Sequence, residues 1–184
     1  MMKTFSGKEV EMDILWSPWR SKYIQSFKDE KSREDCEKTC IFCDALKDEG
    51  NEKEMLIVTR REKCFVILNK FPYNGGHIMV APVRHIGNLE ELEDEEIFAL
   101  IKTIKESIKV LRQISQPHGF NIGVNQGRVA GAGIPGHIHF HIVPRWNGDT
   151  SFMPVISDTK IVSQSLEETQ EIISKTFIEL FSKP

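Results

Sequence analysis

The segment His137-Ile-His-Phe-His-Ile-Val143 contains three of the six histidines of the sequence. Histidine alternates there with apolar residues, and successive side chains of a β-strand point to opposite faces of the sheet. We therefore expect a strand over 137–143 whose three imidazoles share one face, with neighbours roughly 6.5–7 Å apart. The isoleucines and the phenylalanine between them would anchor the opposite face in the core.

Three imidazoles on one face predict chemistry at phosphorus or at a metal. Near neutral pH one imidazole can attack as a nucleophile while another donates a proton. The backbone N–H groups of the glycine-rich stretch Gly131–Gly136 could bind an anion such as phosphate. The guanidinium of Arg145 could donate a pair of hydrogen bonds to the same phosphate. Three imidazoles can equally hold a zinc ion with one open position, and spacing alone does not separate the two interpretations.

The regions around this segment predict an α+β domain. Short apolar runs indicate strands at 55–59, 64–68, 77–81 and 119–125, with a turn over 69–76. Apolar residues three and four apart predict a long helix over 92–114, and a terminal helix is expected over 165–181 with Ser165 as its cap. We expect a mostly antiparallel sheet of about five strands with these two helices.

Size, charge and hydropathy exclude several classes of protein. The chain has 184 residues, 40% of them hydrophobic, and a formal net charge of -3. This charge argues against a general nucleic-acid binder, and no apolar run approaches the roughly 20 residues of a membrane-spanning helix. The first 13 residues contain no apolar signal-peptide core, so we expect no membrane partner and a cytoplasmic location.

Two cysteines in the motif Cys40-Ile-Phe-Cys43 indicate a metal or redox site, because they are too close for an ordinary disulfide. Zinc would need two further ligands, and no second cysteine pair of this spacing exists, so histidines are the candidates. The alternative is a pair of reduced cysteines packed under a loop. Cys64 lies in an apolar run typical of a buried side chain, and the role of Cys36 is open.

The run His137-Ile-His-Phe-His-Ile-Val-Pro-Arg145 resembles the signature of the histidine-triad (HIT) nucleotide hydrolases and transferases. Upstream, Phe65-Val-Ile-Leu-Asn69 followed by Gly76-His-Ile-Met-Val-Ala-Pro82 is similar to the nucleotide-binding hairpin of that family. The flanking segments Trp16-Ser-Pro-Trp-Arg20 and Pro144–Phe152 look most like its diadenosine tetraphosphate phosphorylase-like branch. The resemblance implies a HIT-like fold and a domain over 40–152. An N-terminal extension with a tryptophan-rich docking segment (1–39) would precede it, and a C-terminal tail and helix (153–184) would follow.

The resemblance also implies roles for individual residues. His139 would attack the α-phosphorus and form a covalent nucleotidyl-imidazole intermediate, and His141 would contact the phosphate. Asn69 would hold the ribose, Ile67 or Leu68 would flank the base, and His77 and Asn125 would line the nucleotide pocket. Many family members carry Gln or Ser four residues before the first triad histidine, to contact phosphate or leaving group, where this sequence has Gly133.

The zinc-containing members of the family imply a metal site at Cys40, Cys43, His85 and His137. Four protein ligands would close this site, so the zinc would be structural rather than catalytic. The leading substrate is diadenosine tetraphosphate, with water or phosphate as the acceptor, and the family implies a homodimer. Two other functions remain open: a zinc-dependent hydrolase that uses the triad as metal ligands, and a non-catalytic nucleotide-binding protein.

Overall fold

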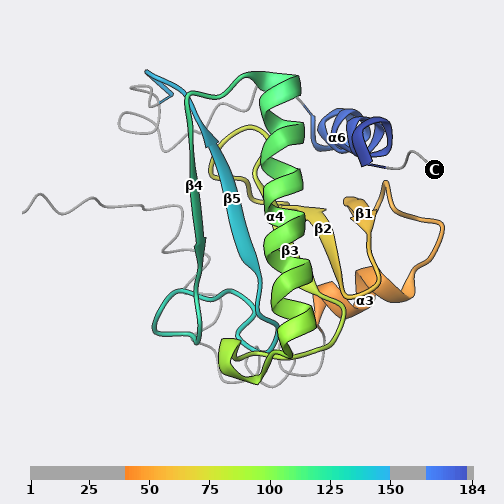
Figure 1. Ribbon diagram of the computed structural model, residues 1–184, viewed down its shortest axis with the longest axis vertical. Coiled ribbons are helices and arrows are strands. Elements are labelled where there is room, and N and C mark those ends of the chain that lie inside the picture. Colours follow the sequence, from red (N-terminus) through yellow and green to blue (C-terminus); the bar gives the residue numbers. More distant parts are fainter. Residues whose placement is uncertain (1–39, 150–164, 182–184) are drawn as a thin grey trace, which may run out of the picture.

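The computed structural model describes residues 40–149 and 165–181. An antiparallel sheet of five strands forms the centre of the molecule, in the order β1-β2-β3-β5-β4 (Figure 1). The strands are β1 (Ile57–Arg60), β2 (Cys64–Leu68), β3 (Ile78–Pro82), β4 (Gly119–Val124) and β5 (Phe140–Arg145). The helices are α3 (Ile41–Lys47), the short 3₁₀ helix η1 (Leu89–Glu91), α4 (Asp94–Ser115) and α6 (Leu166–Phe181). The α+β class and the five-stranded antiparallel sheet are confirmed.

The two faces of the sheet are covered by different helices. All five residues of β2 are buried, and their side chains alternate between two hydrophobic clusters. Val66 and Leu68 pack with α4 and α6, whereas Phe65 and Ile67 pack with Phe42 of α3. Ile138 and Ile142 belong to the α4 cluster, as the alternation in the histidine run predicts. The histidines are thereby directed to the face that α3 covers.

Helix α4 follows the predicted amphipathic pattern, and its ends are well defined. Glu93 and Glu96 form a reciprocal capping box at its start, and Glu96 also accepts two hydrogen bonds from Arg84. Gln116 ends the helix in the left-handed conformation, with φ of 44°. At α6, the backbone N–H of Glu168 donates to the Ser165 hydroxyl over 3.1 Å, so Ser165 is the predicted cap.

Two local predictions were wrong. The strand expected over 137–143 begins at Phe140, which is the last residue of β5 that pairs with β3, opposite Val80; Pro82, two residues further along β3, has no N–H to donate to this ladder. His137 and His139 therefore precede the strand, although Ile138 still donates to the Ile86 carbonyl over 2.7 Å. The segment after Cys40, expected as a knuckle and polar linker, forms helix α3. The predicted docking segment around Trp16 lies outside the described residues.

Candidate functional site

His139 is almost fully buried, at 5% exposure, and one of its ring nitrogens is committed to the backbone. Its Nδ1 lies 2.8 Å from the carbonyl oxygen of His137. A carbonyl oxygen only accepts, so Nδ1 carries the proton and Nε2 carries the lone pair. Burial lowers the pKa of His139, which favours the neutral ring. The fold therefore holds a neutral imidazole in the tautomer that has Nε2 available as a base or nucleophile.

His141 is next to His139, with ring centroids 4.9 Å apart, and it is bonded to a further histidine. Nε2 of His77 lies 3.0 Å from Nδ1 of His141, and Nδ1 of His77 accepts the backbone N–H of Tyr73 over 3.0 Å. Because His77 accepts at Nδ1, its Nε2 is the donor, and His141 accepts at Nδ1. This chain of bonds assigns the N–H of a neutral His141 to Nε2.

The aromatic ring of Phe42 holds the first two triad histidines in place. Its centroid lies 5.1 Å from that of His137 and 4.9 Å from that of His139. Phe42 is 1% exposed and comes from α3, so this short helix closes the α3 face of the sheet over the triad. It also brings Cys43 next to His137.

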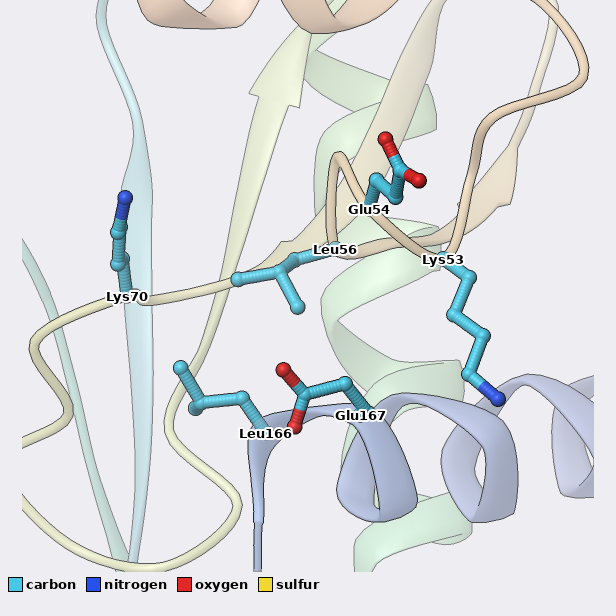
Figure 2. Close-up of a pocket in the computed structure, with 6 residues that line it drawn as sticks. All are labelled: Lys53, Glu54, Leu56, Lys70, Leu166 and Glu167. Carbon is cyan, nitrogen blue, oxygen red and sulfur yellow. The ribbon is translucent and has the colours of Figure 1, made fainter.

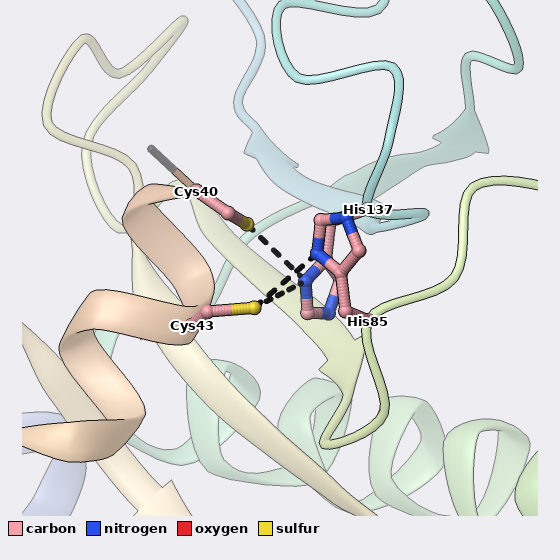
Figure 3. Close-up of side chains that lie close together, drawn as sticks. All are labelled: Cys40, Cys43, His85 and His137. Carbon is pink, nitrogen blue, oxygen red and sulfur yellow. Dashed lines mark hydrogen bonds between the residues drawn. The ribbon is translucent and has the colours of Figure 1, made fainter. Parts of the chain in front are cut away.

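Four side chains from three separate segments converge on one point (Figure 3). Cys40 and Cys43 come from the start of α3, His85 follows β3, and His137 precedes β5. The Sγ of Cys40 lies 3.4 Å from Nδ1 of His137, and the Sγ of Cys43 lies 3.3 Å from Nδ1 of His85 and 3.6 Å from Nδ1 of His137. All four ligand atoms lie within 4.8 Å of one another.

This donor set fits a tetrahedral metal ion. Metal–sulfur and metal–nitrogen bonds of about 2.3 and 2.0 Å place tetrahedral ligands roughly 3.3–3.8 Å apart, which matches the three distances. His137 is also prepared as a ligand: its Nε2 donates to the Pro82 carbonyl over 2.8 Å, so Nδ1 is unprotonated. Burial and the neighbouring Cys40 raise the pKa of Cys43 to about 11, and a bound cation would reverse that effect.

A close backbone approach holds the two histidine ligands together. A Cβ added at Gly87 would lie 2.6 Å from the carbonyl oxygen of Pro135, so no larger residue fits there without a shift. This contact ties the segment that carries His85 to the loop before His137. The cluster thus joins the α3 segment, the end of β3 and the start of β5.

The predicted nucleotide-binding residues do not all lie on the face of the triad. Met79 pairs with both Ile67 and His141, and directly paired residues of antiparallel strands share a face. Ile67 therefore faces the side of His141, whereas Leu68, expected as a possible base contact, is buried in the α4 cluster on the other side. Asn69 follows on the side of Ile67, and its Oδ1 accepts the Phe71 N–H over 2.9 Å.

His77, Asn125 and Gly133 lie around the triad in different ways. His77, expected as a pocket wall, is fully buried and contacts His141 instead of the surface. Asn125 follows β4, and its Nδ2 lies 3.4 Å from the Gly131 carbonyl. Gly133 is partly buried in the loop between Asn125 and His137.

A shallow hollow of about 350 Å³ lies beside His141. We call it the β4 groove, and its lining includes Tyr73, Asn121, Gly123, Asn125, His141 and Val143. A second hollow of about 420 Å³ lies where α6 begins (Figure 2). Two lysines and two glutamates surround two leucines there (Lys53, Glu54, Leu56, Lys70, Leu166 and Glu167), and no histidine lines it. The β4 groove is the hollow that adjoins the histidines.

Phe42 and Tyr73 are the functional residues that sequence reasoning missed. Tyr73 stacks at 4.8 Å on His77 and lies 5.9 Å from His141, and its backbone N–H fixes the tautomer of His77. The aromatic residue inside the Cys-Ile-Phe-Cys motif was a usable signal for Phe42, because a residue between two metal ligands lies close to the site. No local signal indicated Tyr73, whose contacts depend on the turn before β3.

Comparisons with known proteins agree with this arrangement. Residues 50–148 match the family model of the HIT domain. The chain is 35% identical over 171 residues to a Mycobacterium tuberculosis protein named AP-4-A phosphorylase, which covers 91% of this chain and 86% of that protein. Within the described residues, none of the helices has the length and apolar character needed to cross a membrane.

Solved structures show the same fold. A Zn-bound histidine triad family protein from Mycobacterium smegmatis superposes with a TM-score of 0.62 at 25% identity, over 78% of this chain and 96% of that one. A histidine triad nucleotide-binding protein from Sulfolobus tokodaii has a TM-score of 0.62 at 28% identity, over 77% of this chain and 93% of that one.

Proposed function

This chain belongs to the histidine-triad (HIT) family of nucleotide hydrolases and transferases, and we propose that it cleaves dinucleoside polyphosphates at an α-phosphorus through a covalent nucleotidyl-His139 intermediate. Diadenosine tetraphosphate is the leading substrate, because the 35% identical relative is named for it. The observation that carries the proposal is the bond from His139 Nδ1 to the His137 carbonyl, which leaves the Nε2 lone pair for attack.

In the first step, Nε2 of His139 attacks the α-phosphorus. A P–N bond forms as the P–O bond to the leaving ATP breaks, and the imidazole becomes cationic. The His137 carbonyl accepts the Nδ1–H throughout, so it stabilises the charged ring. In the second step, an oxygen of phosphate or of water attacks the phosphorus. A new P–O bond forms as the P–N bond to His139 breaks, which gives ADP with phosphate or AMP with water. The neutral imidazole is regenerated in both cases.

The neighbouring residues would bind and orient the nucleotide. His141, with its N–H on Nε2, would donate to the phosphoryl oxygens, and His77 would hold its ring in that tautomer. Asn69 would bind the ribose and Ile67 would flank the base, because both lie on the triad face. Gly133 has no side chain to contact the leaving group, so we propose that water supplies its proton while the Nε2–H of His141 donates a hydrogen bond to the phosphate oxygens.

We further propose that Cys40, Cys43, His85 and His137 hold a structural zinc ion. Two thiolates and two imidazoles suit zinc, and a site closed by four protein ligands has no open position for substrate. A zinc ion bound there would cross-link α3 to the segment that carries the triad. The competing function, in which the triad itself holds a catalytic metal, is disfavoured because His137 is engaged at both ring nitrogens: its Nδ1 lies against Cys40 and Cys43, and its Nε2 donates to the Pro82 carbonyl.

We propose a homodimer, formed by α4 and the edge strand β4. Large apolar side chains are exposed on α4, with Phe98 at 72% and Ile101 at 56%. Ile122 of β4 is 48% exposed and pairs with Ile142, so it lies on the same side of the sheet as α4. An exposed apolar patch beside a sheet edge that pairs with no other described strand is typical of an interface between copies.

Product analysis tests the proposed function. Purified protein is incubated with diadenosine tetraphosphate, with and without inorganic phosphate, and the nucleotides are separated. ADP plus ATP that appear only with phosphate identify a phosphorylase. AMP plus ATP in both tubes identify a hydrolase. A nucleotide that binds without any product and without covalent labelling of the protein would favour the non-catalytic alternative.

A further inference from the structure

We propose that the β4 groove binds the leaving half of a dinucleoside polyphosphate, namely the phosphates and nucleoside beyond the α-phosphorus that His139 attacks. This inference rests on the proposed function and extends it, because it names the part of the chain that distinguishes a dinucleotide from a mononucleotide. The central residue is Gly123, which pairs directly with His141 in the β4–β5 ladder.

The structure gives no internal reason for glycine at position 123. Its backbone does not have the positive φ that favours glycine, and a Cβ built there would have no atom within 4 Å among the described residues. Glycine inside a strand weakens that strand, and it often marks a place where a ligand approaches closely. Gly123 lies near the C-terminal end of β4, and unlike Gly119 of the same strand it pairs with a histidine of the triad and lines the β4 groove, so a ligand that passes His141 would account for it.

The register places a polar row on the side of His141. Asn121 and Gly123 are two residues apart on β4, so they share one face, and the pairing of Gly123 with His141 makes it the face of that histidine. Asn125 follows directly after the strand and also lines the groove. Asn121 Oδ1 accepts a hydrogen bond of 2.7 Å from Arg145, so its amide nitrogen is the end of the side chain that can donate to a ligand. Carboxamide donors suit phosphate oxygens and ribose hydroxyls.

The β4 groove lies on the opposite side of the triad from the proposed nucleoside site, where the leaving group of a displacement at the α-phosphorus would be. Ile67 and Asn69, proposed for the base and ribose, lie on β2 and directly after it, and β4 is at the far edge of the sheet beyond β3 and β5. The triad lies between these two regions. A nucleoside bound on the β2 side therefore directs the polyphosphate past His141 into the β4 groove. The groove's volume of about 350 Å³ is within the range of small-ligand sites.

Binding measurements on the full-length, metal-loaded protein test this proposal. The background is His139→Ala, which keeps the dinucleotide intact. Calorimetry measures the Kd of AMP and the Kd of diadenosine tetraphosphate for two proteins: the His139→Ala variant, and the double variant that also carries Gly123→Val. Valine favours a strand and would project into the groove. We expect the ratio of the tetraphosphate Kd to the AMP Kd to rise at least about tenfold.

Gly119→Val is the matched control. Gly119 lies on the same strand and face, has no positive φ and no atom within 4 Å of its Cβ position, but it does not line the groove. The Kd ratio should stay unchanged in this variant. Size-exclusion chromatography of both variants checks that the oligomeric state is the same.

Three outcomes would overturn the proposal. If Gly123→Val weakens AMP and the tetraphosphate equally, the groove takes the nucleoside half. If it weakens neither, or if the tetraphosphate binds the His139→Ala protein no tighter than AMP, the groove contributes nothing to binding. The wild-type product analysis is separate from these measurements, so absence of turnover would contradict the proposed function while the binding ratio still decides the role of the groove.

Discussion

Nε2 of His77 lies 3.0 Å from Nδ1 of His141, and this bond links the triad to the turn before β3. His77 is fully buried, and the Tyr73 N–H donates to its other ring nitrogen. The backbone of the turn therefore sets the tautomer of a histidine that is two residues away from the proposed nucleophile. A fully buried side chain thereby orients a histidine of the triad.

His77→Ala should lower kcat more than it raises KM. The change removes the donor that fixes His141 but leaves Asn69 and Ile67 in place for the nucleotide. We expect kcat to fall by about 10–100-fold, as for other lost orienting hydrogen bonds, with KM changed by less than about threefold. Steady-state kinetics with diadenosine tetraphosphate measures both constants. A rise in KM at constant kcat would instead make His77 a binding residue.

His139→Ala should abolish turnover and leave nucleotide binding nearly intact. The change removes the Nε2 lone pair on which the covalent step depends, so we expect a loss of at least about a thousandfold in kcat/KM. Radiolabelled substrate with acid quench detects the nucleotidyl-enzyme in the wild type, and the label should be absent from the variant. Wild-type rates in the variant would rule out the covalent mechanism.

If the proposed zinc site is correct, Cys43→Ser should abolish zinc binding and destabilise the protein. Cys43 contacts both histidines of the cluster, so its loss leaves three ligands with weakened geometry. Metal analysis of protein purified without added zinc should give about one ion per wild-type chain and much less in the variant, with a lower Tm. Cys64→Ala is the control, because Cys64 is buried near Thr103 in the α4 cluster and should keep full zinc content.

Chelation separates a structural zinc from a catalytic one. If the cluster is structural, a chelator should lower the Tm while the initial rate, measured before the protein unfolds, stays close to normal. An immediate loss of activity that precedes any change in the circular dichroism spectrum would support the metallohydrolase alternative.

The Arg84–Glu96 pair should contribute stability that disappears in acid. Hydrogen bonds from Arg84 lower the pKa of the nearly buried Glu96 from 4.5 to about 2. The folded pKa is depressed, so the stabilisation is fully present above about pH 4.5 and is lost as the pH falls towards 2. Since Arg84 is about half exposed, we expect Glu96→Gln to cost about 1–2 kcal/mol near pH 7.

Urea denaturation of the wild type and of Glu96→Gln between pH 7 and pH 3 measures this contribution. The difference in unfolding free energy should be constant down to about pH 5 and then shrink. Any acid-induced loss of metal affects both proteins and cancels in the difference. Glu95→Gln, an exposed neighbour on α4, should show no difference at any pH. A gap that is as large at pH 3 as at pH 7 would contradict the assignment.

Phe98→Glu should convert the proposed dimer to monomers. A buried carboxylate in an interface between copies is costly, because it loses its hydration without gaining a partner. Sedimentation velocity at micromolar concentration measures the change. Ile178→Glu is the control, since Ile178 is similarly exposed, at 63%, but lies on α6. Dimers that persist in the Phe98 variant would place the interface elsewhere.

The sequence alone determined the α+β class, the positions of most strands and helices, and the division of the triad segment into a core face and a histidine face. These features follow from local periodicity, because alternation and three-to-four spacing are set by the geometry of a single strand or helix. The same local signals failed where tertiary contacts override them. Strand β5 starts at Phe140, because Ile138 donates its N–H to the Ile86 carbonyl instead of joining the β3 ladder, and α3 forms where a knuckle was expected.

The resemblance implied the set of Cys40, Cys43, His85 and His137, and the tertiary structure brings these residues together, but only the tertiary structure shows the partner of His141. His137 pairs with cysteines that precede it by about a hundred residues, whereas His141 pairs with His77 across the sheet. Register likewise put Ile67 rather than Leu68 on the triad face and set Gly123 opposite His141. Such relationships depend on how strands are ordered and aligned, and a shift of one residue would reverse every face. No local pattern in the chain specifies that alignment, so only packing of the complete sheet fixes it.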